Sequence, residues 1–202
     1  MYSTITARFR GIAPMLQHSA KTVDEQHPLK IKMDELVDKK KSLRDRSKKR
    51  ELDIQISRVE WEAGLHFDKK MGPYVPGPAV WRAIQEAAKT KRKGADVKRA
   101  VTVLEDFPLE YDGPRTLEKM WAAKDEDGFC QFADRRAVSV SNKRVIRTRP
   151  KFEDWSIIVQ IHFNEEMMAK DTLVQLLHMA GFVGIGDFRE RFGKFEVEIL
   201  SK

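Results

Sequence analysis

The stretch of chain between residues 181 and 199 combines glycine and arginine in a pattern that suits phosphate binding. Its key residues are, in order, Gly184, Gly186, Arg189, Arg191 and Gly193. Glycine accepts backbone conformations with φ > 0 and lets a phosphate or another backbone come close. Arginine supplies a permanently charged, planar fork of donors that matches phosphate geometry. The pattern therefore indicates a nucleic-acid backbone as the first ligand to consider.

A simpler interpretation of the same stretch is structural. Gly181 would end a helix, and the glycines after it would shape the turn into a last strand. Two nucleotide-binding motifs do not fit. Arg189 occupies the third glycine position of a dinucleotide fingerprint, and Gly193-Lys194 is followed by Phe195 rather than by the Ser or Thr of a phosphate-binding loop.

A second group of arginines lies in segment 134–150, which the sequence predicts to be a protruding β-hairpin. Two alternating runs flank a polar turn at 141–143. Period-two geometry places Arg147 and Arg149 on one face of this hairpin and Arg144 on the other. Phosphate contacts from such a set would fix the register of a bound strand without reading its sequence.

The predicted nucleic-acid-binding residues come from this hairpin, from the C-terminal loop and from a basic cluster before residue 100. They are Lys91, Arg92, Lys93, Lys98, Arg99, Arg135, Arg136, Lys143, Arg144, Arg147, Arg149, Arg189 and Arg191. Gly184, Gly186 and Gly193 form the predicted backbone-approach loop. Aromatic side chains that could stack on bases are Phe188, Phe192, Tyr74 and Trp155, although such residues also serve as core.

The net charge of +7 conceals a stronger segregation of charge along the chain. Residues 30–50 hold ten Lys/Arg against four Asp/Glu, residues 89–99 hold six against one, and residues 135–151 hold seven against none. Solvated helix faces could explain one such run. Three runs indicate a polyanion-binding surface, because neutralised phosphates release counterions and dominate affinity.

The sequence gives little support for catalysis. The five histidines show no close metal-ligand spacing, and Cys130 is the single cysteine. We therefore expect that the protein binds no metal ion and no cofactor, and that it is not an enzyme. His18 is the one residue whose role in catalysis should be checked. One cysteine excludes an internal disulfide framework and suits the cytoplasm. No apolar run approaches the roughly 18 residues of a membrane span, so we expect no membrane partner.

The elements that must position these residues follow from hydrophobic periodicity. We expect strands at 2–10, 98–103, 155–163 and 195–199, and helices over 30–62, from 78 to 94, at 117–121 and at 170–181. This order predicts an α+β fold with a ferredoxin-like or RRM-like antiparallel sheet and helices on one face. Residues 1–202 would form a single domain, with 22–62 as a helical insertion.

Two separated segments resemble the RAMP superfamily, the RRM-like subunits of CRISPR effector complexes. Residues 73–82, PYVPGPAVWR, resemble the entry to that family's first core helix, and residues 184–197 look like its C-terminal glycine loop and final strand. Residues 11–18 are similar to the turn after its first strand. A further likeness, carried by segments between Gly72 and Phe152, is to compact phage-encoded RAMP-like proteins that resemble the backbone-type subunits.

The resemblance implies single-stranded nucleic-acid binding and head-to-tail assembly along the strand. Our first hypothesis is a non-catalytic binder that oligomerises on its ligand, with single-stranded DNA in phage replication or recombination as the first choice. A RAMP-type RNA-binding subunit, or an RNA-processing endoribonuclease that uses His18, is the second. The third is a protein-interaction factor, such as an assembly factor or a mimic of a CRISPR subunit.

Overall fold

The computed structural model describes residues 2–140 and 143–200, and these fall into two compact units. Unit 1 consists of residues up to Leu16, Phe67–Asp112 and Phe152 onward. Unit 2 consists of Gln17–His66 and Gly113–Lys151. The predicted helical insertion and the predicted hairpin therefore belong to the same unit, although about 70 residues separate them in the sequence.

Unit 1 is built on a four-stranded sheet in the order β10-β1-β9-β5, with every neighbouring pair antiparallel. The strands are β1 (Tyr2–Gly11), β5 (Val101–Thr102), β9 (Ser156–Asn164) and β10 (Phe195–Ile199). The alternation expected from the sequence is present, since Ile5, Ala7 and Phe9 of β1 are fully buried while the residues between them are not.

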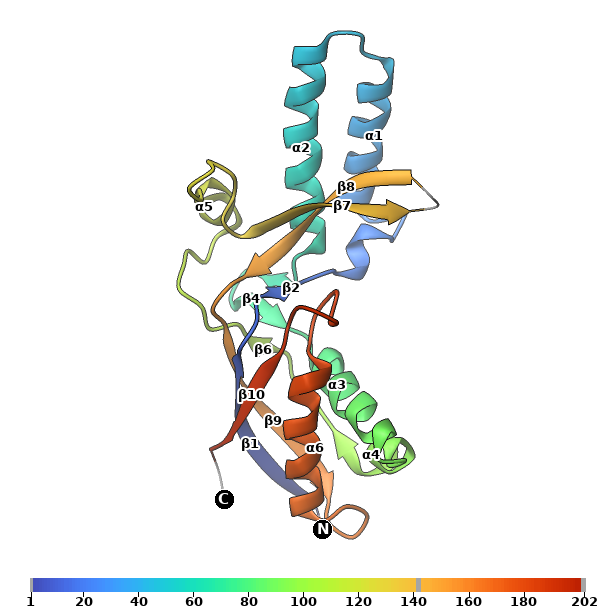
Figure 1. Ribbon diagram of the computed structural model, residues 1–202, viewed down its shortest axis with the longest axis vertical. Helices are drawn as coiled ribbons and strands as arrows, with labels where there is room; N and C mark the ends of the chain where they lie inside the picture. Colours follow the sequence, from blue (N-terminus) through green and yellow to red (C-terminus); the bar gives the residue numbers. More distant parts are fainter. Residues whose placement is uncertain (1, 141–142, 201–202) are drawn as a thin grey trace. The chain divides into compact units, whose positions relative to one another are not determined.

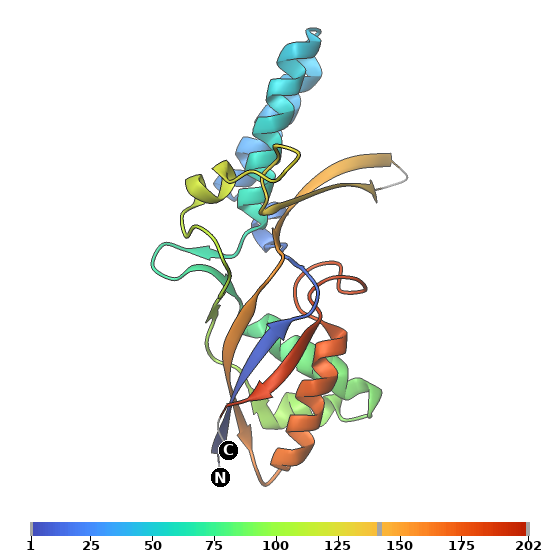
Figure 2. The same ribbon diagram turned by 60° about the vertical axis from the view of Figure 1, so that its left-hand side comes forward.

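Two helices cover one face of this sheet, as Figure 2 shows: α3 (Gly77–Thr90) and α6 (Lys170–Val183). Helix α3 has the clearer apolar stripe, with Val80, Ile84 and Ala87 buried at helical spacing. Leu173 and Leu177 supply the corresponding positions of α6. The predicted α+β class with antiparallel sheets is therefore confirmed.

The remaining elements of unit 1 are short: β2 (Met15–Leu16), β3 (Phe67–Asp68), β4 (Gly72–Val75), α4 (Gly94–Ala100) and β6 (Phe107–Pro108). The strand expected at 98–103 is wrong over most of its length. Val97 and Ala100 are both buried, three residues apart, so helical spacing applies up to Ala100 and only β5 is extended.

Unit 2 contains a helical hairpin and a β-hairpin, both visible in Figure 1. Its elements are the short helix η1 (Ala20–Thr22), α1 (Pro28–Ser42), α2 (Arg46–Gly64), α5 (Leu117–Ala122), β7 (Ala133–Val140) and β8 (Lys143–Phe152). The expected helix over 30–62 is thus two antiparallel helices, because the chain turns at residues 43–45 and Asp45 caps α2 through the amides of Ser47 and Lys48. The two residues of the predicted turn at 141–142 lie outside the described part of the chain.

The core of unit 2 gathers on the C-terminal half of α2. Trp61 is fully buried, its indole nitrogen donates to the carbonyl of Phe132 over 2.8 Å, and its ring lies 5.5 Å from that of Trp121. The other end of the helical hairpin is exposed, and buried side chains there are few. Met33 is the buried residue of α1.

The C-terminal glycine loop of unit 1 is held by the protein's own backbone. Gly186, with a φ of 90°, would bring a Cβ within 2.2 Å of the carbonyl oxygen of Leu16, and Gly193 would bring one within 1.8 Å of that of Ile185. The amide of Gly193 donates to Pro14 and that of Asp187 donates to Leu16, both over 2.8 Å. These glycines are therefore required by close chain packing.

Substitution of Gly186 by alanine should destabilise unit 1, because the new methyl group adds a steric clash to an unfavourable positive φ. We expect a loss of at least about 2 kcal/mol in the free energy of unfolding. Gly128→Ala is a matched control, since Gly128 also has a positive φ of 78° but faces open space. Thermal denaturation of both variants checks this, and equal losses would contradict it.

Candidate nucleic-acid interface

The whole excess of positive charge lies in unit 2. Its residues include 22 Lys/Arg against 15 Asp/Glu, which gives +7, whereas unit 1 has 16 of each and is neutral. Two of the three basic runs, 30–50 and 135–151, belong to unit 2. A polyanion would therefore be attracted to unit 2 first.

The β-hairpin of unit 2 presents its arginines on two faces. In the strand register, Arg136 stands directly opposite Arg147, and Asp134 opposite Arg149, so Arg136, Arg147 and Arg149 share one face. Arg135 and Arg144 project from the other face, and both are exposed. Lys143 begins β8, but its side chain lies outside the part of the structure that is described.

Glu60 of α2 ties the hairpin to the helices. Glu60 is 8% exposed, and its two carboxylate oxygens accept from the guanidinium of Arg147 and from the backbone amide of Thr148, each over 2.8 Å. A buried carboxylate needs such partners, because burying an unpaired charge is very costly. The Arg147 side chain remains 42% exposed, so donors beyond the one bound to Glu60 face solvent.

A cavity of about 290 Å³ lies beside this ion pair, within unit 2. Its lining includes Arg147, Thr148 and Arg149 of β8, Ser139 of β7, and His18. The imidazole of His18 lies 3.1 Å from the hydroxyl of Thr22, which also lines the cavity. Basic and hydroxyl groups thus converge from segments far apart in the sequence.

The hydroxyl of Thr148 in β8 is buried and, within the described part of the chain, unsatisfied. Thr148 is 2% exposed, and its hydroxyl has no hydrogen-bond partner among the described residues. Thr148 stands opposite Arg135 in the strand register, so its side chain lies on the other face of the hairpin from Arg147 and Arg149, and its hydroxyl is shielded from solvent. The cavity therefore owes its character to Arg147 and Arg149, which favour an anionic ligand such as a phosphate group.

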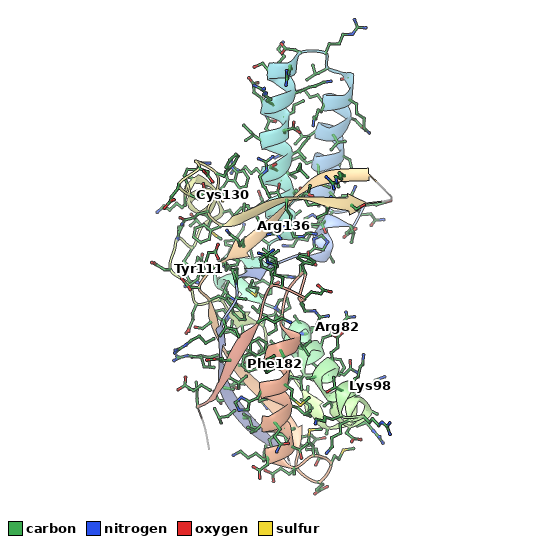
Figure 3. All side chains as sticks on the ribbon, viewed as in Figure 1. Arg82, Lys98, Tyr111, Cys130, Arg136 and Phe182 are labelled. Atoms are coloured by element: carbon green, nitrogen blue, oxygen red, sulfur yellow. The ribbon has the colours of Figure 1, made fainter. Side chains whose placement is uncertain are left out.

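The basic cluster at residues 91–99 lies in unit 1, on and before α4. Lys91, Arg92, Lys93, Lys98 and Arg99 are all exposed, and Figure 3 labels Lys98. Arg99 lies 3.6 Å from Asp96 on its own helix. These residues lie together in unit 1, whereas the hairpin arginines belong to unit 2.

Arginines of the C-terminal loop have partners within unit 1. Arg189 binds Glu86 of α3 over 3.0 Å, and Glu86 also binds Arg82 over 3.2 Å. Burial raises the pKa of the Glu86 carboxyl, but the two arginines outweigh this and hold that pKa below its ordinary value. Arg191 lies over the ring of Phe192, with 5.9 Å to its centre. Arg189 therefore has a structural role in anchoring the loop.

The four aromatic residues singled out from the sequence differ in exposure. Trp155 and Phe192 are buried, Tyr74 is half-buried, and Phe188 is 46% exposed at a positive φ of 52°. On the face of the sheet opposite the helices, Arg8 and Arg10 stand across from Glu198 and Glu196. Charges on that face are therefore balanced between neighbouring strands.

Sequence reasoning missed several residues of unit 2. The exposed end of the helical hairpin carries a group of cations. The basic run 30–50 indicated them, but they were not among the predicted site residues. They are Lys39, Lys40, Lys41, Arg44, Arg46, Lys48, Lys49 and Arg50. Thr148 and Phe129 were also missed, and no local pattern marks either one.

Neither a metal site nor a membrane span is found in the described part of the chain. Among residues 2–140 and 143–200, no group of three His, Cys, Asp or Glu side chains could hold a metal ion. Within the same ranges, no helix is both long and apolar enough to cross a membrane. A comparison with protein-family models finds no match, and a search of curated proteins finds no significant one.

Replacing Glu60 by glutamine should loosen the hairpin from α2. Glutamine keeps the shape but offers one acceptor, so either Arg147 or the Thr148 amide loses its partner. We expect a loss of about 1–3 kcal/mol in the free energy of unfolding, the cost of an unsatisfied buried group. Asp53→Asn is the control, because the Asp53–Lys40 pair of the same helices is exposed and should contribute less than about 1 kcal/mol. Chemical denaturation measures both, and the prediction is wrong if the two changes are equal.

Proposed function

We propose that the protein binds single-stranded nucleic acid without catalysis, through phosphate contacts made by the β-hairpin of unit 2. The observation that carries this proposal is the basic cavity of unit 2, which is lined by Arg147, Arg149 and His18. The charge of +7 on unit 2 supports it, because phosphate neutralisation dominates nucleic-acid affinity. Single-stranded DNA is the favoured ligand, with assembly of several copies along one strand in the cytoplasm.

We propose further that unit 1 is ferredoxin-like. Its order β10-β1-β9-β5, with α3 after β1 and α6 after β9, corresponds to the β-α-β-β-α-β arrangement in which the first and fourth strands pair and the third lies between the first and second. This arrangement supports the RRM-like part of the RAMP resemblance. Helices on one face leave the opposite face of the sheet and the loops for other contacts.

Arg149→Gln tests the proposal, because it removes a positive charge that lines the cavity and keeps a long polar side chain. The affinity for a single-stranded oligonucleotide should fall by about tenfold, the value of one hydrogen bond to a charged group. Fluorescence anisotropy with a labelled 30-nucleotide DNA measures the affinity.

Arg10→Gln on β1 is the matched control, since Arg10 is exposed and lies in unit 1. Binding should also be stronger to single-stranded than to double-stranded DNA of the same sequence, and it should weaken steeply as salt rises. Equal binding to both forms, or an affinity that salt does not change, would reject the proposed function.

RNA cleavage is a second candidate function, and the position of His18 favours it. His18 lines the same cavity as Arg147, so an RNA phosphate held there would be near an imidazole that could act as a general base. This alternative predicts metal-independent cleavage of a hairpin RNA, which is lost in His18→Ala and retained in His162→Ala. Intact RNA after incubation with the wild-type protein, analysed on a denaturing gel, would exclude it.

A further inference from the structure

A second cavity of unit 2 differs in character from the one beside Glu60. It has a volume of about 500 Å³ and is mainly apolar. Its walls come from α2, from α5 and the segment after it, and from both strands of the hairpin, and they include Trp121, Phe129 and Cys130. Cys130, labelled in Figure 3, is buried, and its thiol lies 3.3 Å from the carbonyl of Met120.

Large apolar side chains remain exposed around this cavity. Phe129 is 54% exposed, Ile54 of α2 is 62% exposed, and Ile146 of β8 is 56% exposed. Three such side chains around one concave site make an apolar surface that a monomer normally covers or uses for binding. This apolar surface therefore indicates a ligand with an apolar face.

Phe129 is held in its exposed position by a tight turn. Its amide donates to the side chain of Asp125 and the amide of Asp125 donates back to the carbonyl of Phe129, both over 2.8 Å. Gly128 closes the turn with a positive φ of 78°. Because its backbone is already fixed, Phe129 loses less conformational entropy when a ligand stacks on its ring.

Each aromatic ring of the cavity lies next to a cation. The guanidinium of Arg135 lies 5.5 Å from the centre of the Phe129 ring, and the ammonium group of Lys124 lies 5.9 Å from that of Trp121. Arg135 is also a hairpin residue, on the strand that faces β8. The cavity thus combines flat apolar surfaces with positive charge at its rim.

We propose that this cavity binds an unpaired nucleobase of the bound strand. The base would stack on Phe129 and Trp121, and the flanking phosphates would lie near Arg135 and Lys124. The charge of the rim argues for this ligand, because a nucleotide is apolar on its base faces and anionic at its phosphate. The inference rests on the proposed function and adds to it a contact with the base that does not depend on salt.

The test compares two strands that carry the same phosphates. One is a 20-nucleotide oligothymidylate, and the other is a 20-nucleotide strand of abasic sites. The wild-type protein should bind the oligothymidylate about 5- to 150-fold more tightly, the range given by one stacked base. Phe129→Ala should remove most of this difference by weakening only the oligothymidylate complex. Phe182→Ala is the control, since Phe182 is 84% exposed in unit 1.

A second readout separates stacking from charge. Arg144→Gln should weaken both strands and reduce the slope of log affinity against log salt, by about 0.7 for one phosphate contact. Phe129→Ala should leave that slope unchanged. Tryptophan fluorescence should be quenched by oligothymidylate in the wild-type protein and much less in Trp121→Phe, because stacked bases quench indole.

The outcomes distinguish this inference from the proposed function. If both strands bind with equal affinity, the nucleobase site is wrong while phosphate binding stands, and the cavity would instead accept an apolar side chain of a protein partner. Equal effects of Phe129→Ala and Phe182→Ala would also overturn it. If neither strand binds, the proposed function fails and the nucleobase site fails with it.

Discussion

The carboxylate of Glu60 connects the two halves of unit 2, and the geometry of the hairpin depends on it. One oxygen binds the guanidinium of Arg147 and the other binds the amide of Thr148, so the central residues of β8 cannot move along α2 without breaking a bond. The carboxylate is buried, although the Arg147 side chain is 42% exposed. Removing either partner would leave an oxygen of this buried carboxylate unsatisfied, and this cost helps to fix the position of β8. The cavity beside Arg147 exists because β8 is held there.

Several arginines that look equivalent in the sequence have different roles in the structure. Arg147 and Arg189 each bind a glutamate on a neighbouring helix, and Arg136 binds Asp134 on its own strand. Each of these ion pairs uses part of the hydrogen-bonding capacity of the guanidinium group to hold the fold together. Arg135 and Arg144 are exposed on the opposite face of the hairpin from Arg136 and Arg147, which leaves them suited to contacts with a ligand.

Local sequence patterns predicted most of the helices and strands, but they did not predict the contacts between distant segments. Alternation at 2–10 and 195–199 predicted β1 and β10, and the apolar stripe of Val80 and Ile84 predicted α3. The segment 98–103 was misassigned because a short apolar run fits either period. No sequence pattern could reveal that Glu60 binds the amide of Thr148, 88 residues away, or that Gly186 packs against the backbone of Leu16.

The exposed end of the helical hairpin consists mainly of cations around the turn between α1 and α2. Like charges three or four residues apart on a helix repel each other, and few buried side chains there oppose that repulsion. This repulsion destabilises the last turn of α1 and the first turn of α2. A polyanion that neutralises these charges would bind the helical form more tightly. By linkage, the free energy that helix formation adds to binding equals the free energy that binding adds to helix stability. The end of the hairpin would then gain helical order as ligand binds, and lose it again as salt screens both effects.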